Sequence, residues 1–158
     1  MTKDHLRPKR HSGLEALRHH PGACSCQKLR SASRAVTKMY DEHLQPAGLT
    51  ISQYSVLAAL YYVSAMPLRK LANKLELDRT TLTRSLARLE QQGFISATID
   101  ATDSRIRSIA ITDAGLQKLI DCYPLWSRAQ EQLALALGPR GLGDLRKSLD
   151  KSIGAMKV

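Results

Sequence analysis

The stretch Asp78-Arg-Thr-Thr-Leu-Thr-Arg-Ser-Leu-Ala-Arg-Leu-Glu-Gln-Gln-Gly93 decides the fold of this chain. Aspartate is a strong helix N-cap and glycine commonly follows a helix, so the stretch predicts a helix from Arg79 to about Gln92. A shorter helix precedes it across the turn Glu76-Leu77. The apolar stripe of that shorter helix consists of Leu68, Leu71, Ala72 and Leu75. Two helices joined by a short turn are the sequence outline of a helix-turn-helix.

Two strands are predicted directly after this pair of helices. Phe94–Ile99 and Ile106–Ile111 are rich in β-branched residues, and the connection Asp100–Arg105 is polar and turn-forming. A β-hairpin in this position has the layout of a wing.

The sequence before this region is predicted to be helical. One helix runs from Cys24 to about Gln45, where Pro46 and Gly48 stop it. A second begins after Thr50-Ile-Ser-Gln53, which has the residues of a capping box. Three residues are expected to break the chain after this helix: Ser64, Met66 and Pro67.

Two more helices are predicted towards the C-terminus. Thr112 is expected to cap a long helix, which Pro124 should kink or divide and Gly138-Pro139 should end. An apolar stripe then marks a last helix through Leu142, Leu145, Leu149 and Met156. This stripe has no obvious partner within a small winged domain.

Composition narrows the class of protein. The chain has 158 residues, 43% of them hydrophobic, which fits one globular domain. Its apolar runs are too short for a membrane span, and Met1–Pro21 lacks the apolar segment of a secretory signal. Three cysteines make no disulfide framework, so we expect a cytoplasmic protein. The net charge of +10 indicates a polyanionic partner, most often nucleic acid.

The outer face of the Arg79–Gln92 helix suits a DNA major groove. At about 100° per residue, Leu82, Leu86 and Leu89 share the inner face. Arginine can bind guanine O6 and N7, threonine can contact a thymine methyl or a phosphate, and N-terminal amides can bind phosphate. The candidate DNA contacts on this helix are Arg79, Thr80, Thr81, Thr83, Arg84 and Arg88. The alternative is an ordinary solvated helix face.

The hairpin supplies further candidate DNA contacts. Arg105 and Arg107 are two residues apart and therefore lie on the same side of a strand. Asp103 can brace Arg105 and hold it towards a minor groove or a phosphate. The alternative is a surface ion pair that contributes little.

At the level of its motifs, the chain resembles the MarR family of bacterial winged helix-turn-helix regulators. The matching stretches are Leu49–Leu57 (LTISQYSVL), Leu71–Leu75 (LANKL), Asp78–Ile95, Asp103–Arg105 and Ile111–Gly115 (ITDAG). Their order and spacing are more specific than any single motif. The wing departs from the family pattern at Thr102, where another arginine is common, and at Ser104, where a charged residue is common.

The resemblance implies a mainly α fold with a small β-hairpin wing, in which a winged helix-turn-helix domain is joined to a helical dimerisation region. The expected organisation is a flexible basic arm at 1–22, an N-terminal dimerisation helix at 23–48, the DNA-binding domain at 49–112 and C-terminal dimerisation helices at 113–158. The resemblance further implies a homodimer that binds a palindromic operator in double-stranded DNA.

The resemblance also implies a pocket for a small effector between the dimer helices and the winged domain. The candidate lining residues are Arg30, Arg34, Tyr40, His43, Tyr54 and Trp126. An arginine among aromatic rings would suit an aromatic carboxylate. The predicted function is thus a transcriptional regulator, a repressor that a small ligand releases from DNA. Each residue could instead be a core aromatic or a solvated cation.

Cys24 and Cys26 suggest a different trigger. They lie at the start of the first predicted helix, where the helix dipole favours a thiolate. Some proteins of the resembled family sense peroxides through a cysteine near this place. Residues two apart on a helix do not face each other, so a disulfide between them would need unwound backbone. With His19 and His20 they could gather round a soft metal, although the spacing matches no standard zinc module, and Cys122 is expected in the core.

Two other hypotheses therefore stay open. One is a thiol-redox or metal-responsive repressor of the same fold, and the other is a non-specific nucleic-acid-binding protein driven by the basic arm. An enzyme with a cysteine nucleophile would need an orienting group and an oxyanion hole, and no motif supplies either. No enzymatic activity, cofactor or resident metal is predicted.

Overall fold

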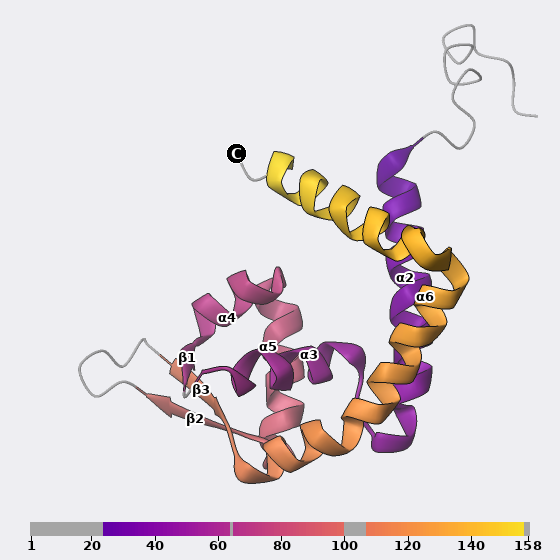
Figure 1. Cartoon of the computed structure of the whole chain (residues 1–158). Coiled ribbons are helices and arrows are strands. Elements are labelled where there is room, and N and C mark those ends of the chain that lie inside the picture. Colours follow the sequence, from indigo (N-terminus) through magenta and orange to yellow (C-terminus); the bar gives the residue numbers. More distant parts are fainter. Residues whose placement is uncertain (1–23, 64, 100–106, 157–158) are drawn as a thin grey trace, which may run out of the picture. The chain divides into compact units, whose positions relative to one another are not determined.

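The structure is a computed structural model that describes residues 24–63, 65–99 and 107–156. By its internal contacts the chain divides into two compact units, Met1–Ala35 and Val36–Val158. The described chain is mainly helical, with one three-stranded antiparallel sheet, which confirms the predicted fold class (Figure 1). None of the described helices is long and apolar enough to cross a membrane.

Helix α2 spans Ser25–Leu44, close to the predicted bounds, and the boundary between the two units falls within it. Every described residue of the first unit is exposed. In the second unit, Tyr40 and Leu44 are buried. The 3-10 helix η2, Gln45–Ala47, follows, and Gly48 ends it with a left-handed φ of 69°. The predicted stop at Pro46 and Gly48 is therefore confirmed.

Helix α3 spans Ile51–Tyr61 and lies at the centre of the second unit's core. Its predicted capping box is present, because the Gln53 amide donates to Thr50 Oγ1 and the Thr50 amide donates to Gln53 Oε1 at 2.9 Å. A carboxylate from α2 adds to this cap, since Asp41 Oδ1 accepts a hydrogen bond from the Ile51 amide at 2.7 Å. Three polar groups therefore fix the start of α3.

The sheet contains the predicted hairpin and one further strand. Strands β2, Ile95–Ile99, and β3, Arg107–Ile111, pair antiparallel, with Ile95 opposite Ile111. Strand β1, Met66–Pro67, pairs with the other edge of β3, so the order is β1-β3-β2. Helix α3 ends before Met66 and Pro67, in keeping with the expected break, but these two residues also form an edge strand, which was not predicted. A two-residue strand is too short to show a period in sequence, and proline is accepted in an edge strand.

Helices α4, Leu68–Leu75, and α5, Arg79–Gln91, form the predicted helix-turn-helix. Glu76 makes the turn between them with a left-handed φ of 53°, and Gly93 follows α5 with a φ of 73°. These two helices pack on α3 and the sheet around one hydrophobic core. The fully buried large side chains of that core are Leu44, Val56, Leu57, Leu60, Leu71, Leu82, Leu89, Ile109 and Cys122.

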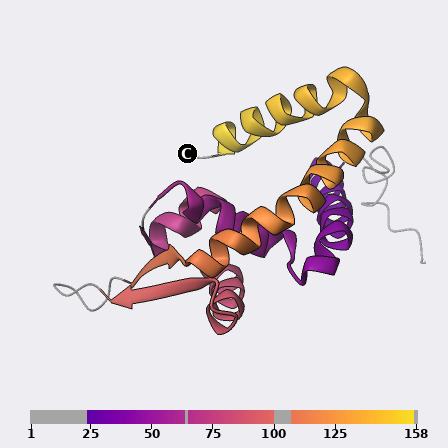
Figure 2. The same ribbon diagram turned by 60° about the horizontal axis from the view of Figure 1, so that its bottom comes forward.

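Helix α6 spans Asp113–Met156, and the predicted division at Pro124 is wrong. The only non-helical backbone within it is Gly138, with φ 78° and ψ 174°, so the predicted end at Gly138-Pro139 is confirmed. Cys122 and Ala129 are fully buried on either side of the exposed Pro124. Core packing therefore holds the helix together despite the cost of about 3 kcal/mol that an interior proline brings. The ribbon of α6 changes direction C-terminal to Pro124, where its colour passes from orange to yellow (Figures 1 and 2).

Candidate nucleic-acid interface

Helix α5 begins at a strong cap. Asp78 Oδ1 accepts from the Thr81 amide at 2.9 Å, and Oδ2 accepts from Thr81 Oγ1 at 2.6 Å. These hydrogen bonds hold the pKa of Asp78 below its usual value, and the bond from the Thr81 hydroxyl has the largest effect. The inner residues Leu82, Leu86 and Leu89 are buried as predicted. The cap and the core thus fix which face of α5 is turned outward.

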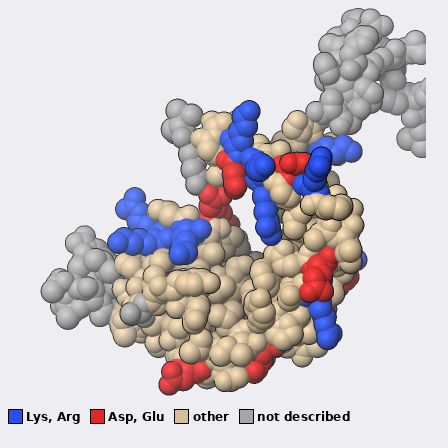
Figure 3. Space-filling view, viewed as in Figure 1, with Lys and Arg blue, Asp and Glu red and all other residues tan. Residues whose placement is uncertain are grey.

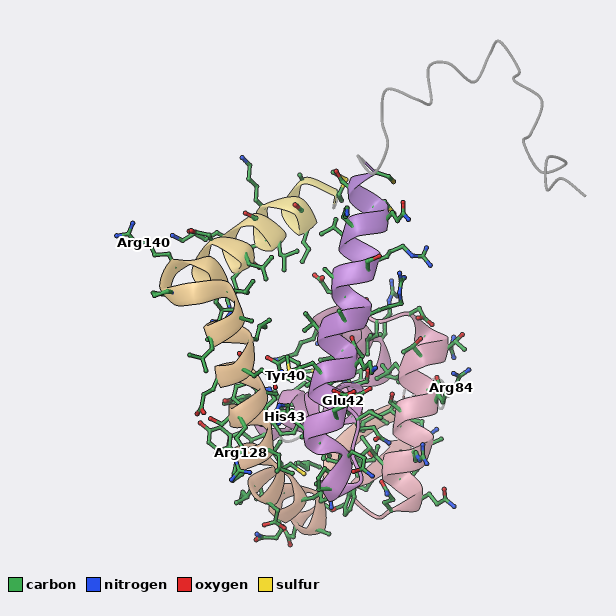
Figure 4. All side chains as sticks on the ribbon, turned by 90° about the vertical axis from the view of Figure 1, so that its right-hand side faces the viewer. Tyr40, Glu42, His43, Arg84, Arg128 and Arg140 are labelled. Carbon is green, nitrogen blue, oxygen red and sulfur yellow. The ribbon has the colours of Figure 1, made fainter. Side chains whose placement is uncertain are left out.

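That outer face carries arginines without partners. Arg79, Arg84 and Arg88 are exposed, and within the described chain no hydrogen bond or ion pair engages their guanidinium groups. Arg84 points away from the body of the second unit (Figure 4). The three cations are therefore available for a phosphate or a base edge.

The threonines of α5 differ in availability. Thr81 gives its hydroxyl proton to Asp78, and Thr83 gives its own to the Arg79 carbonyl oxygen at 2.7 Å. Thr80 is exposed without such a bond in the described chain. Of the predicted threonine contacts, only Thr80 keeps its hydroxyl proton for an outside acceptor.

The predicted wing residues fall partly outside the described residues, where Asp103 and Arg105 lie. Arg107, at the start of β3, is bound to α5. Its Nη2 atom lies 2.9 Å from Glu90 Oε1 and 2.7 Å from Glu90 Oε2. Both side chains are about half exposed. The guanidinium of Arg107 is thus neutralised by a carboxylate of the recognition helix instead of pointing freely outward.

Helix α4 carries a basic group that was not among the predicted DNA contacts. Figure 3 shows Lys and Arg side chains gathered over this helix, whose exposed cations are Arg69, Lys70 and Lys74. The signal was present in the sequence. Leu68, Leu71, Ala72 and Leu75 define the inner stripe, so the residues between them must lie outward. In a helix-turn-helix the first helix crosses the DNA backbone, where such cations can bind phosphate.

A cavity of about 640 Å³ lies beside this winged region, between α3 and α6. Its lining residues are Tyr54, Ala58, Tyr61, Tyr62, Leu116, Leu119, Ile120, Tyr123 and Trp126. Tyr54 and Trp126, both predicted as effector-binding residues, stack with ring centroids 5.8 Å apart. Burial raises the pKa of Tyr54 to about 12. The other tyrosines were missed, although their helical spacing from Tyr54 and Leu116 places them on the same faces.

The remaining predicted effector residues are placed differently. Tyr40 is buried, which raises its pKa, and His43 Nε2 is hydrogen-bonded to Gln132 Oε1 at 2.6 Å. Both lie on α2 in the second unit (Figure 4), but neither lines the cavity. Arg30 and Arg34 are exposed residues of the first unit, and Arg34 donates to Ser31 Oγ at 3.1 Å. Of the predicted set, the structure brings together Tyr54 and Trp126.

The three cysteines fall into two groups. Cys24 and Cys26 are exposed, whereas Cys122 is buried, as expected, and burial raises the pKa of its thiol. Among the described residues, no group of three or more His, Cys, Asp or Glu side chains could hold a metal ion. His19 and His20, the other predicted members of a metal cluster, lie outside the described residues.

The chain is similar to known regulators in sequence. The model of the MarR family matches residues 49–106. The organic hydroperoxide resistance transcriptional regulator of Bacillus subtilis is 36% identical over 90 residues, which are 57% of this chain and 61% of that protein. The regulator YwaE of the same organism, named as uncharacterised, is 28% identical over 136 residues, which cover 81% of this chain and 80% of the relative.

The chain is also similar to solved structures. One is the transcriptional regulator MosR of M. tuberculosis in complex with DNA, with 31% identity, a TM-score of 0.71, and coverage of 85% of this chain and 99% of that one. A mutant MarR of E. coli complexed with operator DNA shares the fold, with 22% identity, a TM-score of 0.71, and coverage of 80% and 91%. With its winged helix-turn-helix and its matched length, the chain belongs to the MarR family of DNA-binding transcriptional regulators, which are not enzymes.

Proposed function

We propose that this protein is a homodimeric repressor that binds a palindromic operator in double-stranded DNA and leaves it when a small ligand binds. The observation that carries the proposal is the outer face of α5, where Arg79, Arg84 and Arg88 are exposed without partners in the described chain. That face has no carboxylate between the Asp78 cap and Glu90. A helix of this kind, set beside a hairpin, suits a major groove.

Within this proposal the cations divide by role. Arg84 and Arg88 bind base edges or phosphates from α5, with Arg79 and Thr80 at its start. Arg69, Lys70 and Lys74 of α4 bind the phosphate backbone, and Arg105 of the wing enters a minor groove. Base contacts of this kind set specificity, whereas phosphate contacts set affinity and its dependence on salt.

Arg107 is proposed as a positioning residue. Its contacts of 2.7 and 2.9 Å with Glu90 join the root of the wing to the C-terminal half of α5. A guanidinium already paired with a carboxylate contributes little net positive charge towards a phosphate. The pair supports a fixed angle between the wing and the recognition helix, so that both reach DNA together.

Dimerisation is supported by apolar side chains exposed on the C-terminal half of α6. These are Leu135, Leu137, Leu145, Leu149, Ile153 and Met156, and Leu135 and Met156 are more than 80% exposed. Apolar residues in such number on one helix indicate a protein interface. A two-fold dimer would place the two α5 helices about one DNA turn, roughly 34 Å, apart. In this proposal residues 113–158 and 23–48 dimerise, 49–112 bind DNA, and the basic arm at 1–22 adds to the attraction.

Ligand release is supported by the position of the cavity. Its walls are α3, at the centre of the winged domain, and α6, which continues into the proposed dimer interface. A molecule held between these helices can favour one spacing of the two winged domains over another. The ligand then shifts the population away from the DNA-competent spacing.

The direct test is DNA binding measured by fluorescence anisotropy with a labelled fragment from the region upstream of the protein's own coding sequence. We expect tight binding with a steep dependence on salt, and weak binding to unrelated DNA. Arg84→Ala should abolish the preference, whereas Arg128→Ala, an exposed arginine of α6 (Figure 4), should keep it. Equal affinity for both DNAs would favour the non-specific nucleic-acid-binding hypothesis instead.

A thiol trigger is the second candidate mechanism, because Cys24 and Cys26 are both exposed and open to oxidants. Its test is DNA binding before and after peroxide treatment of the wild type and of the double variant Cys24→Ser, Cys26→Ser. Loss of binding in the wild type alone would establish a redox response. If peroxide leaves DNA binding unchanged in both proteins, the small ligand remains the proposed trigger.

A further inference from the structure

The aromatic cavity between α3 and α6 differs chemically from the pocket expected for an aromatic carboxylate. Four tyrosines and Trp126 supply the rings, and Ala58, Leu116, Leu119 and Ile120 supply the aliphatic wall. Among the described residues of the Val36–Val158 unit, no Lys, Arg or His lines it. The polar atoms that these side chains bring are therefore tyrosine hydroxyls and the tryptophan N–H, which are neutral donors and acceptors.

We propose that this cavity binds an uncharged aromatic molecule and discriminates against aromatic carboxylates. This inference rests on the proposed function, since it names the ligand class of the site through which that function releases DNA.

The rings are already arranged to receive a flat ligand. Tyr54 and Trp126 stack at an interplanar angle of 16°, and Tyr123 lies against Trp126 with centroids 5.7 Å apart. Tyr54 is buried, whereas Tyr61, Tyr62 and Tyr123 are more than half exposed. An aromatic molecule entering between them exchanges water for ring faces on several sides. A volume of about 640 Å³ is in the range of pockets that enclose drug-sized molecules.

A carboxylate would lose hydration here without gaining a cation. Burying an ionised group is costly unless it is paired and hydrogen-bonded, and the neutral lining offers hydrogen bonds only. The same environment disfavours the anionic form of the lining residue Tyr54, since burial raises the pKa of its hydroxyl. Size and ring stacking would thus admit both classes of ligand, and charge would separate them.

The test compares two molecules with the same ring system, 2-naphthol, which is neutral at pH 7, and 2-naphthoate, which is an anion. Isothermal titration calorimetry on the full-length protein without DNA gives both dissociation constants. Quenching of Trp126, the only tryptophan of the chain, reports occupancy at the site itself. We expect 2-naphthol to bind about tenfold more tightly or better, which corresponds to about 1.4 kcal/mol. Equal binding, or tighter binding of 2-naphthoate, would overturn the inference.

A charge variant keeps the test specific to the cavity. Ile120 lines the cavity and is 56% exposed, so Ile120→Arg can place a guanidinium at its edge without burying it. We expect this variant to bind 2-naphthoate more tightly and to lose the preference for 2-naphthol. Gln117→Arg adds the same charge one turn earlier on α6, at an exposed residue outside the lining, and should keep the wild-type preference. An unchanged preference in Ile120→Arg would overturn the inference.

The same molecules separate this inference from the proposed function. Binding of 2-naphthol that leaves the DNA complex intact would support the ligand class and contradict ligand release through this site. Binding of neither molecule would overturn the inference, and would favour a cavity that a second copy of the chain fills.

Discussion

Gly115→Ala is predicted to disrupt the junction between the wing and α6. A Cβ atom at this position would lie 1.9 Å from the Phe94 carbonyl oxygen and 2.8 Å from its carbonyl carbon. Real Cβ contacts are essentially never shorter than 3.0 Å, so one of the two backbones must move by more than 1 Å. The neighbour is main chain, and it cannot turn aside as a flexible side chain would.

The affected backbone is tied into a small hydrogen-bond network. The Thr112 amide donates to the same Phe94 oxygen at 3.1 Å, and the Thr112 hydroxyl donates to the Gly93 oxygen at 2.7 Å. The Gly115 amide in turn donates to Thr112 Oγ1 at 3.1 Å. A displaced Phe94 therefore weakens the link that joins the end of α5 to the start of α6.

The net cost follows from three effects. Overpacking costs about 1–3 kcal/mol, and a weakened hydrogen bond about 1 kcal/mol more. Alanine in place of glycine returns about 1 kcal/mol through its higher helix propensity. We expect Gly115→Ala to lower the free energy of unfolding by about 2 kcal/mol.

The assay is urea unfolding followed by circular dichroism at one fixed protein concentration, because dimerisation contributes to apparent stability. Gly143→Ala is the matched control, since Gly143 lies on the same helix, is exposed, and would have no atom within 4 Å of an added Cβ. It should be neutral or stabilise the protein by up to about 1 kcal/mol. A Gly115→Ala protein as stable as Gly143→Ala would refute the reasoning about Phe94.

Three further predictions concern the DNA contacts, the cap of α5 and the dimer face. Glu90→Gln and Arg107→Gln should each weaken operator binding a few-fold without changing the slope of log affinity against log salt concentration, whereas Lys70→Ala should lower this slope by about one unit. A lowered slope in Arg107→Gln would instead identify Arg107 as a phosphate contact. The pKa of Asp78 is lower in the folded state than its unfolded-state value of 3.8. Asp78 therefore stabilises α5 at pH values above 3.8 and loses this contribution as the pH falls through its folded-state pKa. The urea midpoint of Asp78→Asn should therefore fall less than that of the wild type below about pH 4, and parallel curves would contradict the role of the cap. Leu149→Glu should give a monomer in sedimentation velocity, and this monomer should bind the operator weakly. A Leu149→Glu dimer that still binds DNA would exclude the exposed apolar face of α6 from the dimer interface.

The sequence was sufficient wherever the deciding residues lie within a few positions of one another. The Asp78 cap, the Thr50–Gln53 capping box and the inner leucines of α5 follow from local hydrogen bonding and from the helical period. The stop at Gly138-Pro139 likewise needs no information from elsewhere in the chain. These features gave the fold class and the orientation of the recognition helix.

Tertiary structure decided what distant residues do together. Pro124 keeps its place in α6 because buried neighbours outweigh its local cost, and β1 forms because β3 offers a free edge. Glu90 and Arg107 stand 17 residues apart, so only the packing of β3 beside α5 brings their charges into contact. The cavity needs Tyr54 from α3 and Trp126 from α6. That none of its described lining residues is a cation could not be seen in a sequence that contains 24 lysines and arginines. Local propensity therefore determined the elements, whereas the chemistry of the sites depended on which side chains the folded chain brought face to face.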